Sequence, residues 1–176
     1  MRGALLPALG RLSLQPLAST GAVVDQLRAV SPNRPDYGDI AKWAVKQDPN
    51  ALQAVSPNRP DYLDLAVLAV EADSNALQYV PYNLTDYGSL AMLAVEKNPD
   101  ALQHVDPKLT HYRGVAELAI QKDPNALQHV PIHHADYLDL AVLAVRNDPA
   151  TLRWVPYNLR YYGQLAEMAR AGALRT

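Results

Sequence analysis

Tyrosine recurs along this chain at a constant spacing of 25 residues, and this period constrains the fold more than any other feature. The recurring residues are Tyr37, Tyr62, Tyr87, Tyr112, Tyr137 and Tyr162. With this tyrosine numbered position 1, positions 5 and 8 are alanine, position 16 is leucine and position 19 is valine in six copies each. The chain is therefore an array of short units, each too small to bury a core alone, that must stack on one another.

The first half of each unit predicts an amphipathic α-helix of about three turns. Apolar residues fall at positions 1, 4, 5, 8 and 9, which lie on one face of a helix. Because the alanines at positions 5 and 8 are small, we expect neighbouring helices to pack closely. An aspartate before the tyrosine is expected to be an N-cap whose carboxylate accepts hydrogen bonds from the first turn. These aspartates are Asp36, Asp61, Asp86 and Asp136.

The second half of the unit predicts a much shorter helix. An Asp-Pro or Asn-Pro pair precedes it at 48–49, 98–99, 123–124 and 148–149. In such a pair the first residue caps the helix and proline takes its first position. Few residues remain before the next proline or turn, so we expect the short helix to be 3-10 in part. Asparagine, which tolerates left-handed backbone, recurs in the following connector turns: Asn33, Asn58, Asn83 and Asn158.

These two helices per unit predict an all-α fold, a right-handed α-solenoid in a single domain. We expect the solenoid to span 22–161, as a half unit followed by five full units, and a closing helix to occupy 162–176. Residues 1–21 have two interpretations. They are a cap over the first unit, which we favour slightly, or a targeting segment. A secretory signal is disfavoured because Pro7 and Arg11 interrupt the apolar run.

Composition argues against several classes of function. The formal net charge is −2, whereas nucleic-acid binders usually carry a basic stripe, so we expect no nucleic-acid partner. There is no cysteine for a disulfide or thiolate metal site, and no apolar stretch long enough to span a membrane. We find no HExxH, GxSxG or phosphate-binding glycine-rich motif and expect neither an enzyme nor a cofactor.

Histidines could suggest a metal site, because His104 and His129 occupy the same position, 18, of adjacent units. We identify no set of further histidines or carboxylates that would complete a coordination sphere shared by the two. We therefore favour ordinary variation at a solvent-facing position and predict no metal site.

The units resemble a family of short helical repeats from bacteria and amoebae. The resemblance covers residues 22–170 and is clearest in AVKQDPNALQAVSP at 44–57 and AVEKNPDALQHVDP at 94–107. That family is known only as a domain of unknown function and occurs in effector proteins of host-associated bacteria. The leucine-rich variant repeat is a more distant resemblance. The resemblance implies a protein that a bacterium secretes into a host cell, and it supplies no catalytic residues.

Variation against the fixed frame is concentrated at positions 17 and 18, in the short helix. We take this stripe as the candidate binding site for a protein partner, because large amphipathic rings are enriched at interfaces. Packing of the rings on one another explains the stripe equally well. Its members are Gln78, Tyr79, Gln103, His104, Gln128, His129, Arg153 and Trp154.

Two functions of different classes follow. The first is a non-catalytic scaffold that binds a protein partner through this stripe. The alternative is a structural protein that assembles head to tail, because the array begins and ends with complementary half units. A contact of that kind produces open filaments when it does not close into a ring.

Overall fold

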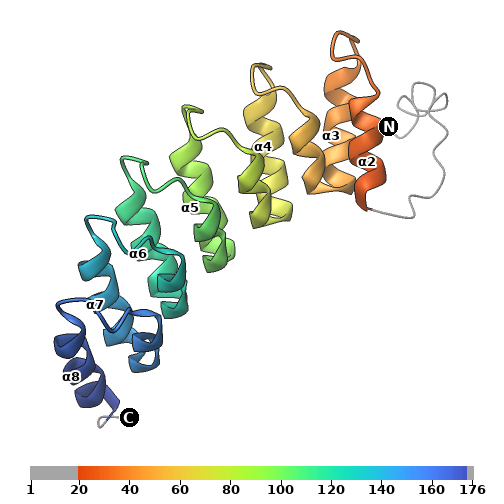
Figure 1. The fold of residues 1–176 in the computed structure, drawn as a ribbon. Helices are drawn as coiled ribbons and strands as arrows, with labels where there is room; N and C mark the ends of the chain where they lie inside the picture. Colours follow the sequence, from red (N-terminus) through yellow and green to blue (C-terminus); the bar gives the residue numbers. More distant parts are fainter. Residues whose placement is uncertain (1–19, 174–176) are drawn as a thin grey trace. The chain divides into compact units, whose positions relative to one another are not determined.

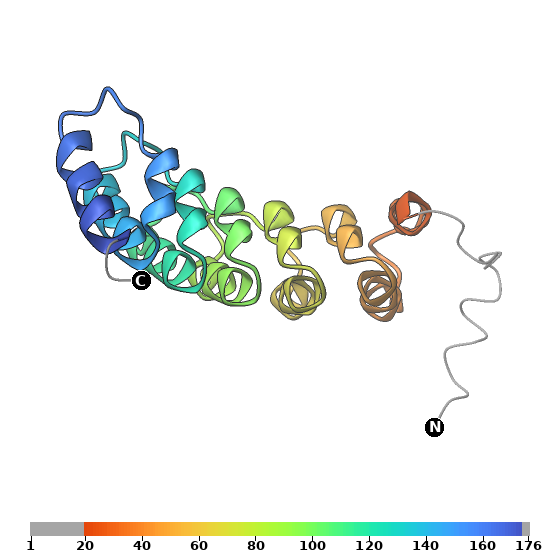
Figure 2. The same cartoon turned by 90° about the horizontal axis from the view of Figure 1, so that it is seen from below.

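A computed structural model describes residues 20–173 of the chain, which is all-α with 3-10 helices between the α-helices. The chain divides into two compact units, residues 1–79 and 80–176. In each unit the α-helices form one layer and the 3-10 helices a second (Figures 1 and 2). The first unit holds α2 (Thr20–Arg28), α3 (Tyr37–Gln47), η1 (Pro49–Ala54), α4 (Tyr62–Ala72) and η2 (Ser74–Tyr79). The second holds α5 (Tyr87–Lys97), η3 (Pro99–His104), α6 (Tyr112–Lys122), η4 (Pro124–His129), α7 (Tyr137–Asn147), η5 (Pro149–Trp154) and α8 (Tyr162–Ala173).

The predicted amphipathic helix is confirmed, with 11 residues in each of α3 to α7. In α4 the buried residues are Tyr62, Leu65, Ala66, Ala69 and Val70, which are positions 1, 4, 5, 8 and 9. Both alanines are 0% exposed. Small side chains at the contact thus let adjacent helices of a unit pack side by side, and the repeats form a helical solenoid.

The short helix is 3-10 along its whole length of six residues, in all five copies from η1 to η5. Its predicted cap is confirmed at the Asp-Pro and Asn-Pro pairs. The Asp123 carboxylate, for example, accepts a hydrogen bond from the Asn125 backbone N–H at 2.9 Å. Asp73 makes the same bond to the Asn75 N–H at 2.9 Å although Ser74 replaces the proline. The cap therefore depends on the Asp or Asn side-chain oxygen and not on the proline.

The prediction that the aspartate before each tyrosine caps the α-helix with its side chain is wrong. Asp36, Asp61, Asp86 and Asp136 make no such bond. Their backbone is not extended as at most N-caps; Asp36 has φ −94° and ψ 4°. The Asp36 carboxylate instead binds Arg34 at 2.7 Å, and Asp61 binds Arg59 at 2.8 Å. Asp86 does not cap either, although Leu84 takes the place of the arginine, so the turn conformation of the backbone accounts for the missing cap.

The connectors do not use left-handed backbone, because no residue within 20–173 has a positive φ. Each connector turns by successive hydrogen bonds to the third residue before. In the first connector the Arg34 N–H donates to the Ser31 carbonyl at 3.2 Å, and the Tyr37 N–H donates to the Arg34 carbonyl at 3.1 Å. Two linked turns reverse the chain without strained backbone.

The half units appear at the two ends of the described residues. Helix α2 lies in the layer of the 3-10 helices, where it packs on α3 and η1 (Figure 2). It is α-helical, unlike η1 to η5. The prediction of a cap or targeting segment at 1–21 falls almost entirely outside the described residues.

Candidate functional site

Three of the rings at position 18 form hydrogen bonds to the preceding repeat. The Tyr79 hydroxyl donates to Asn50 Oδ1 at 3.1 Å. His129 Nε2 donates to Asp100 Oδ1 at 3.1 Å, and Trp154 Nε1 donates to Asn125 Oδ1 at 3.1 Å. Every acceptor occupies position 14, the second residue of its 3-10 helix. These rings therefore connect adjacent repeats through hydrogen bonds. This is a structural role, as in the interpretation that the rings of the stripe serve packing.

The same rings remain partly open to solvent. Trp154 is 38% exposed, and Tyr79, His104 and His129 are half-buried. The structure thus places each ring with one edge on its neighbour and another available to a partner.

Position 17 is directed into solvent. Gln78, Gln103 and Gln128 are exposed. Arg153 donates to Asn125 Oδ1 at 2.7 Å, and its guanidinium lies 5.1 Å from the centre of the Trp154 ring. In the second unit η3, η4 and η5 pack in succession. Positions 17 and 18 of this unit consequently form one continuous strip. Gln78 and Tyr79 lie on η2 of the first unit.

Position 23, in the connector, covers the repeat tyrosine, and sequence reasoning did not single it out. The Arg59 guanidinium lies 4.7 Å from the centre of the Tyr37 ring. The His134 ring lies 4.7 Å from the Tyr112 ring at an interplanar angle of 43°. The sequence did contain a signal for this role, because the residue at position 23 varies between arginine, leucine and histidine.

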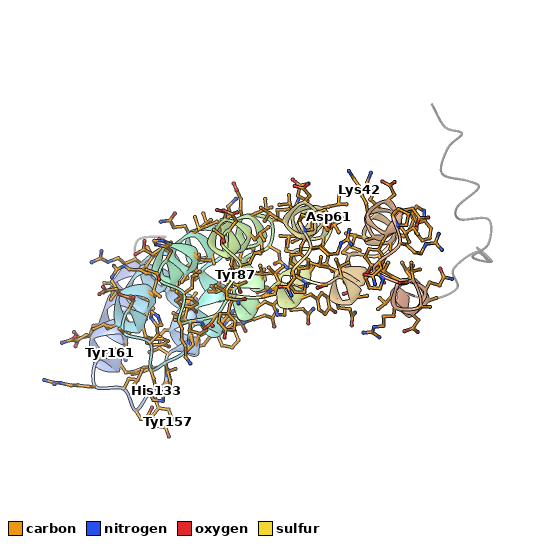
Figure 3. The ribbon with its side chains drawn as sticks, turned by 90° about the horizontal axis from the view of Figure 1, so that it is seen from above. Lys42, Asp61, Tyr87, His133, Tyr157 and Tyr161 are labelled. Carbon is orange, nitrogen blue, oxygen red and sulfur yellow. The ribbon has the colours of Figure 1, made fainter. Side chains whose placement is uncertain are left out.

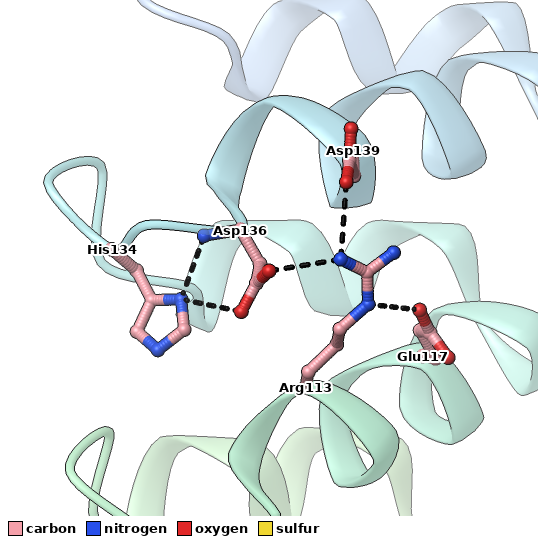
Figure 4. A network of polar contacts seen from close by, with 5 residues as sticks. All are labelled: Arg113, Glu117, His134, Asp136 and Asp139. Atoms are coloured by element: carbon pink, nitrogen blue, oxygen red, sulfur yellow. Dashed lines mark hydrogen bonds and ion pairs between the residues drawn. The ribbon is translucent and has the colours of Figure 1, made fainter.

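A polar network joins α6 to α7 on the surface of the α-helix layer (Figure 4). Arg113 binds Glu117 at 2.8 Å, Asp136 at 2.9 Å and Asp139 at 3.1 Å. The three carboxylates raise the pKa of Arg113 above its usual value. His134 Nδ1 accepts a hydrogen bond from the Asp136 N–H at 3.2 Å. Since Arg113 is 49% exposed, solvent screens these pairs and they add little stability.

Exposed apolar side chains occupy connector position 21 throughout the second unit. Tyr82 is 69% exposed, Ile132 is 42% exposed and Tyr157 is 85% exposed. Pro107 occupies the same position in the remaining connector. Figure 3 shows Tyr157 directed away from the helices. In the first unit, position 21 is proline in both copies, so the exposed tyrosine and isoleucine side chains at this position are specific to the second unit.

Among residues 20–173, no three histidine or carboxylate side chains are grouped closely enough to hold a metal ion. The His129 side chain pairs with Asp100. No helix in that range is long and apolar enough to cross a membrane.

Comparison with known proteins gives one match. Residues 62–111 match a family model described as Domain of unknown function (DUF4116). The matching segment begins at the first residue of α4, ends directly before α6 and is 50 residues long, or two periods. No curated protein and no solved structure matches the chain. The expected likeness to a domain of unknown function is thus confirmed for these two repeats.

Proposed function

We propose that this protein is a non-catalytic helical-repeat scaffold that binds a protein partner. The observation that carries the proposal is the strip at positions 17 and 18 of the second unit. There, exposed amides and one arginine lie beside half-buried rings on consecutive 3-10 helices. Its members are Gln103, His104, Gln128, His129, Arg153 and Trp154.

The strip has the composition of a protein interface. Aromatic side chains and arginine are enriched at the energetically important points of interfaces. Trp154 and Arg153 are held together by a shared bond to Asn125 Oδ1. Side chains positioned in this way lose little conformational freedom when a partner binds, which favours affinity.

The roles of the carboxylates support a non-catalytic protein. Asp123 and Asp148 cap 3-10 helices, while Asp61 and Asp136 bind arginines. These four carboxylates take part in structural bonds. We further infer an effector-type protein that a bacterium releases into a host cell, on the resemblance of the repeats alone.

The test changes the strip without changing its packing. Gln103 and Gln128 are exposed, and their side chains have no hydrogen bond to a described residue. Truncation of Tyr79 or Trp154, by contrast, would break a hydrogen bond between repeats. We expect the double variant Gln103→Lys and Gln128→Lys to lose a host protein that the unaltered chain retains in affinity capture. The Tm should stay within a few degrees because both changes are on the surface.

A matched control places the same lysines on the α-helix layer, at exposed Gln121 and Asn147. Gln121→Lys with Asn147→Lys should retain the partner. Identical sets of captured proteins from both double variants and the unaltered chain would contradict the proposed surface.

The alternative is head-to-tail assembly, which one observation favours. Tyr162 and Ala166 of α8 are half-buried, whereas the equivalent Tyr137 and Ala141 of α7 are buried. A repeat of a second chain would cover them. Sedimentation at several protein concentrations tests this: a molecular mass that rises with concentration supports assembly, and a constant monomer contradicts it.

A further inference from the structure

The helix-layer surface of the second unit holds a groove between α5 and α6 with a volume of about 570 Å³. This size lies within the range of about 300–1,000 Å³ that is common for ligand sites. Connector residues Tyr82 and Leu84 line one side, and Leu109 and Thr110 line the other. Tyr82 also lines a second hollow of about 410 Å³, whose other lining residues are Asp106, Lys108, Leu109 and Thr110. Tyr82, Leu109 and Thr110 thus line both hollows.

This groove lacks the ionic side chains that fill the equivalent surface elsewhere. His111 is the one titratable side chain in its lining besides tyrosine. The corresponding groove between α3 and α4 is lined by acidic and basic residues, and the surface between α6 and α7 carries the Arg113 network. The α3–α4 residues are Asp39, Lys42, Arg59, Asp61, Asp64 and Glu71. An occupant of the α5–α6 groove should therefore be uncharged.

Glycine keeps the groove open. Gly88, at position 2 of the repeat, and Gly114 both line it, and a Cβ added at either would meet no atom within 4 Å. The residue at position 2 is Leu63 in α4 and Leu138 in α7, so the fold accepts a large side chain there. The depth of the α5–α6 groove thus results from its glycines.

Apart from His111, the polar side chains that line the groove carry hydroxyls. Thr85, Ser89 and Thr110 line it together with Tyr82, and none of these side chains has a hydrogen bond to a described residue. Hydroxyls can donate to carbonyl oxygens. A polyproline II segment presents solvated carbonyls without internal hydrogen bonds, and prolines have no N–H that would need an acceptor. Aromatic-lined grooves bind such segments in other proteins.

The spacing of the repeats fits the same ligand. Packed helices lie about 8–10 Å apart, and one turn of polyproline II advances about 9.3 Å over three residues. Successive position-21 residues would therefore meet every third residue of the ligand. Within the second unit these residues are Tyr82, Pro107, Ile132 and Tyr157.

We propose that the α5–α6 groove and the position-21 row of the second unit bind a proline-rich, uncharged polypeptide segment in the polyproline II conformation. This inference rests on the proposed function, because it names the kind of partner that the scaffold would hold. The Tyr82 ring packs on a proline, and the free hydroxyls donate to ligand carbonyls. The α5–α6 groove then sets the position of the ligand, and the row extends the contact.

The test measures binding of a synthetic deca-proline peptide to the full chain by isothermal titration and by tyrosine fluorescence. We expect a dissociation constant in the micromolar to low millimolar range, as for other short peptides with few anchors. Gly88→Leu fills the groove with a side chain that two other repeats carry, and should weaken binding by about tenfold or more. Tyr82→Ala should weaken it similarly, with an unchanged Tm.

Gly163→Leu is the matched control, since Gly163 occupies position 2 of α8 and also has no atom within 4 Å of an added Cβ. It should leave deca-proline binding unchanged. Equal binding of a Gly-Ser peptide of the same length, or equal binding by the Gly88→Leu variant, would overturn the inference.

The two proposals fail separately. If the full chain does not bind deca-proline but the Gln103→Lys and Gln128→Lys variant still loses a captured protein, the proline-rich ligand is wrong and the scaffold stands. If deca-proline binds at Gly88 but those lysines lose nothing, the partner surface lies on the α-helix layer and the 3-10 strip is wrong.

Discussion

The repeat tyrosine joins the α-helix and the 3-10 helix of its own 25-residue repeat. Its ring is buried beneath the connector, and its hydroxyl reaches the end of the 3-10 helix 17 residues later. The Tyr62 hydroxyl donates to the Tyr79 carbonyl at 3.1 Å, and the Tyr87 hydroxyl donates to the His104 carbonyl at 3.0 Å. The Tyr112 hydroxyl is the exception, because it is buried with no partner among the described residues. Phenylalanine would fill the same space without the hydroxyl. The contribution of each hydroxyl to the free energy of unfolding can therefore be measured in one repeat at a time.

Tyr62→Phe should lower the free energy of unfolding by about 1 kcal/mol, because it leaves a carbonyl without its hydrogen bond. Tyr112→Phe should have no effect or stabilise the protein, because it removes a buried hydroxyl that makes no bond. Urea denaturation of both variants checks this pair. A larger loss for Tyr112→Phe than for Tyr62→Phe would contradict the bonding pattern.

Stability should fall at high pH through the same tyrosines. Burial raises the pKa of Tyr62, Tyr112 and Tyr137 to about 12. In the unfolded chain they ionise near pH 10, so the unfolded state binds fewer protons above this pH. The stability from keeping them neutral is complete below pH 10 and is lost as the pH rises towards 12. Unfolding measured at pH 8, 10 and 11, with tyrosinate absorbance, should show this decline; constant stability across the series would refute it.

At the scale of the element, two aspartates per repeat have different roles although both precede a helix. The aspartate before the 3-10 helix has extended backbone and caps; Asp123 has φ −139° and ψ 109°. The aspartate before the α-helix lies in a turn, with φ −101° and ψ 17° at Asp86, and its side chain does not cap. The backbone conformation that precedes the helix decides which aspartate can cap.

Asp123→Ala should lower the free energy of unfolding by about 1 kcal/mol, the usual loss for an N-cap. Asp86→Ala should cost only a few tenths of a kcal/mol, through the helix dipole alone. Thermal denaturation of the two variants in parallel measures the difference. Equal losses would show that the α-helix aspartate caps in solution.

At the scale of the whole molecule, each repeat is stabilised mainly by its immediate neighbours. The described residues form two compact units, each with its own buried leucines at position 16. Leu52 of the first unit and Leu127 of the second are at most 1% exposed. A defect in one unit should therefore be felt mostly within that unit.

Leu52→Ala should cost about 2–5 kcal/mol, as for other buried leucines. Native-state hydrogen exchange should then speed up in α3, η1 and α4, while α6 and α7 keep their protection. Leu127→Ala should give the reverse pattern. Uniform loss of protection throughout residues 20–173 would mean that the two units unfold as one.

The sequence by itself determined the elements and their buried faces. Apolar spacing within 25 residues is a local property, and the caps at Asp48, Asn98, Asp123 and Asp148 act on residues two positions away. The α-helices, the 3-10 helices and the core positions could all be predicted for this reason. The local prediction failed at the aspartate before each α-helix, because the connector holds its backbone in a turn conformation, as at Asp86.

Only the tertiary structure decided which variable side chains meet. Trp154 bonds to Asn125 across 29 residues, and Arg113 reaches Asp136 across 23. The α5–α6 groove exists because Gly88 of one helix and Gly114 of the next line the same hollow. Such contacts depend on how one repeat is placed against the next, which no spacing within a single repeat specifies.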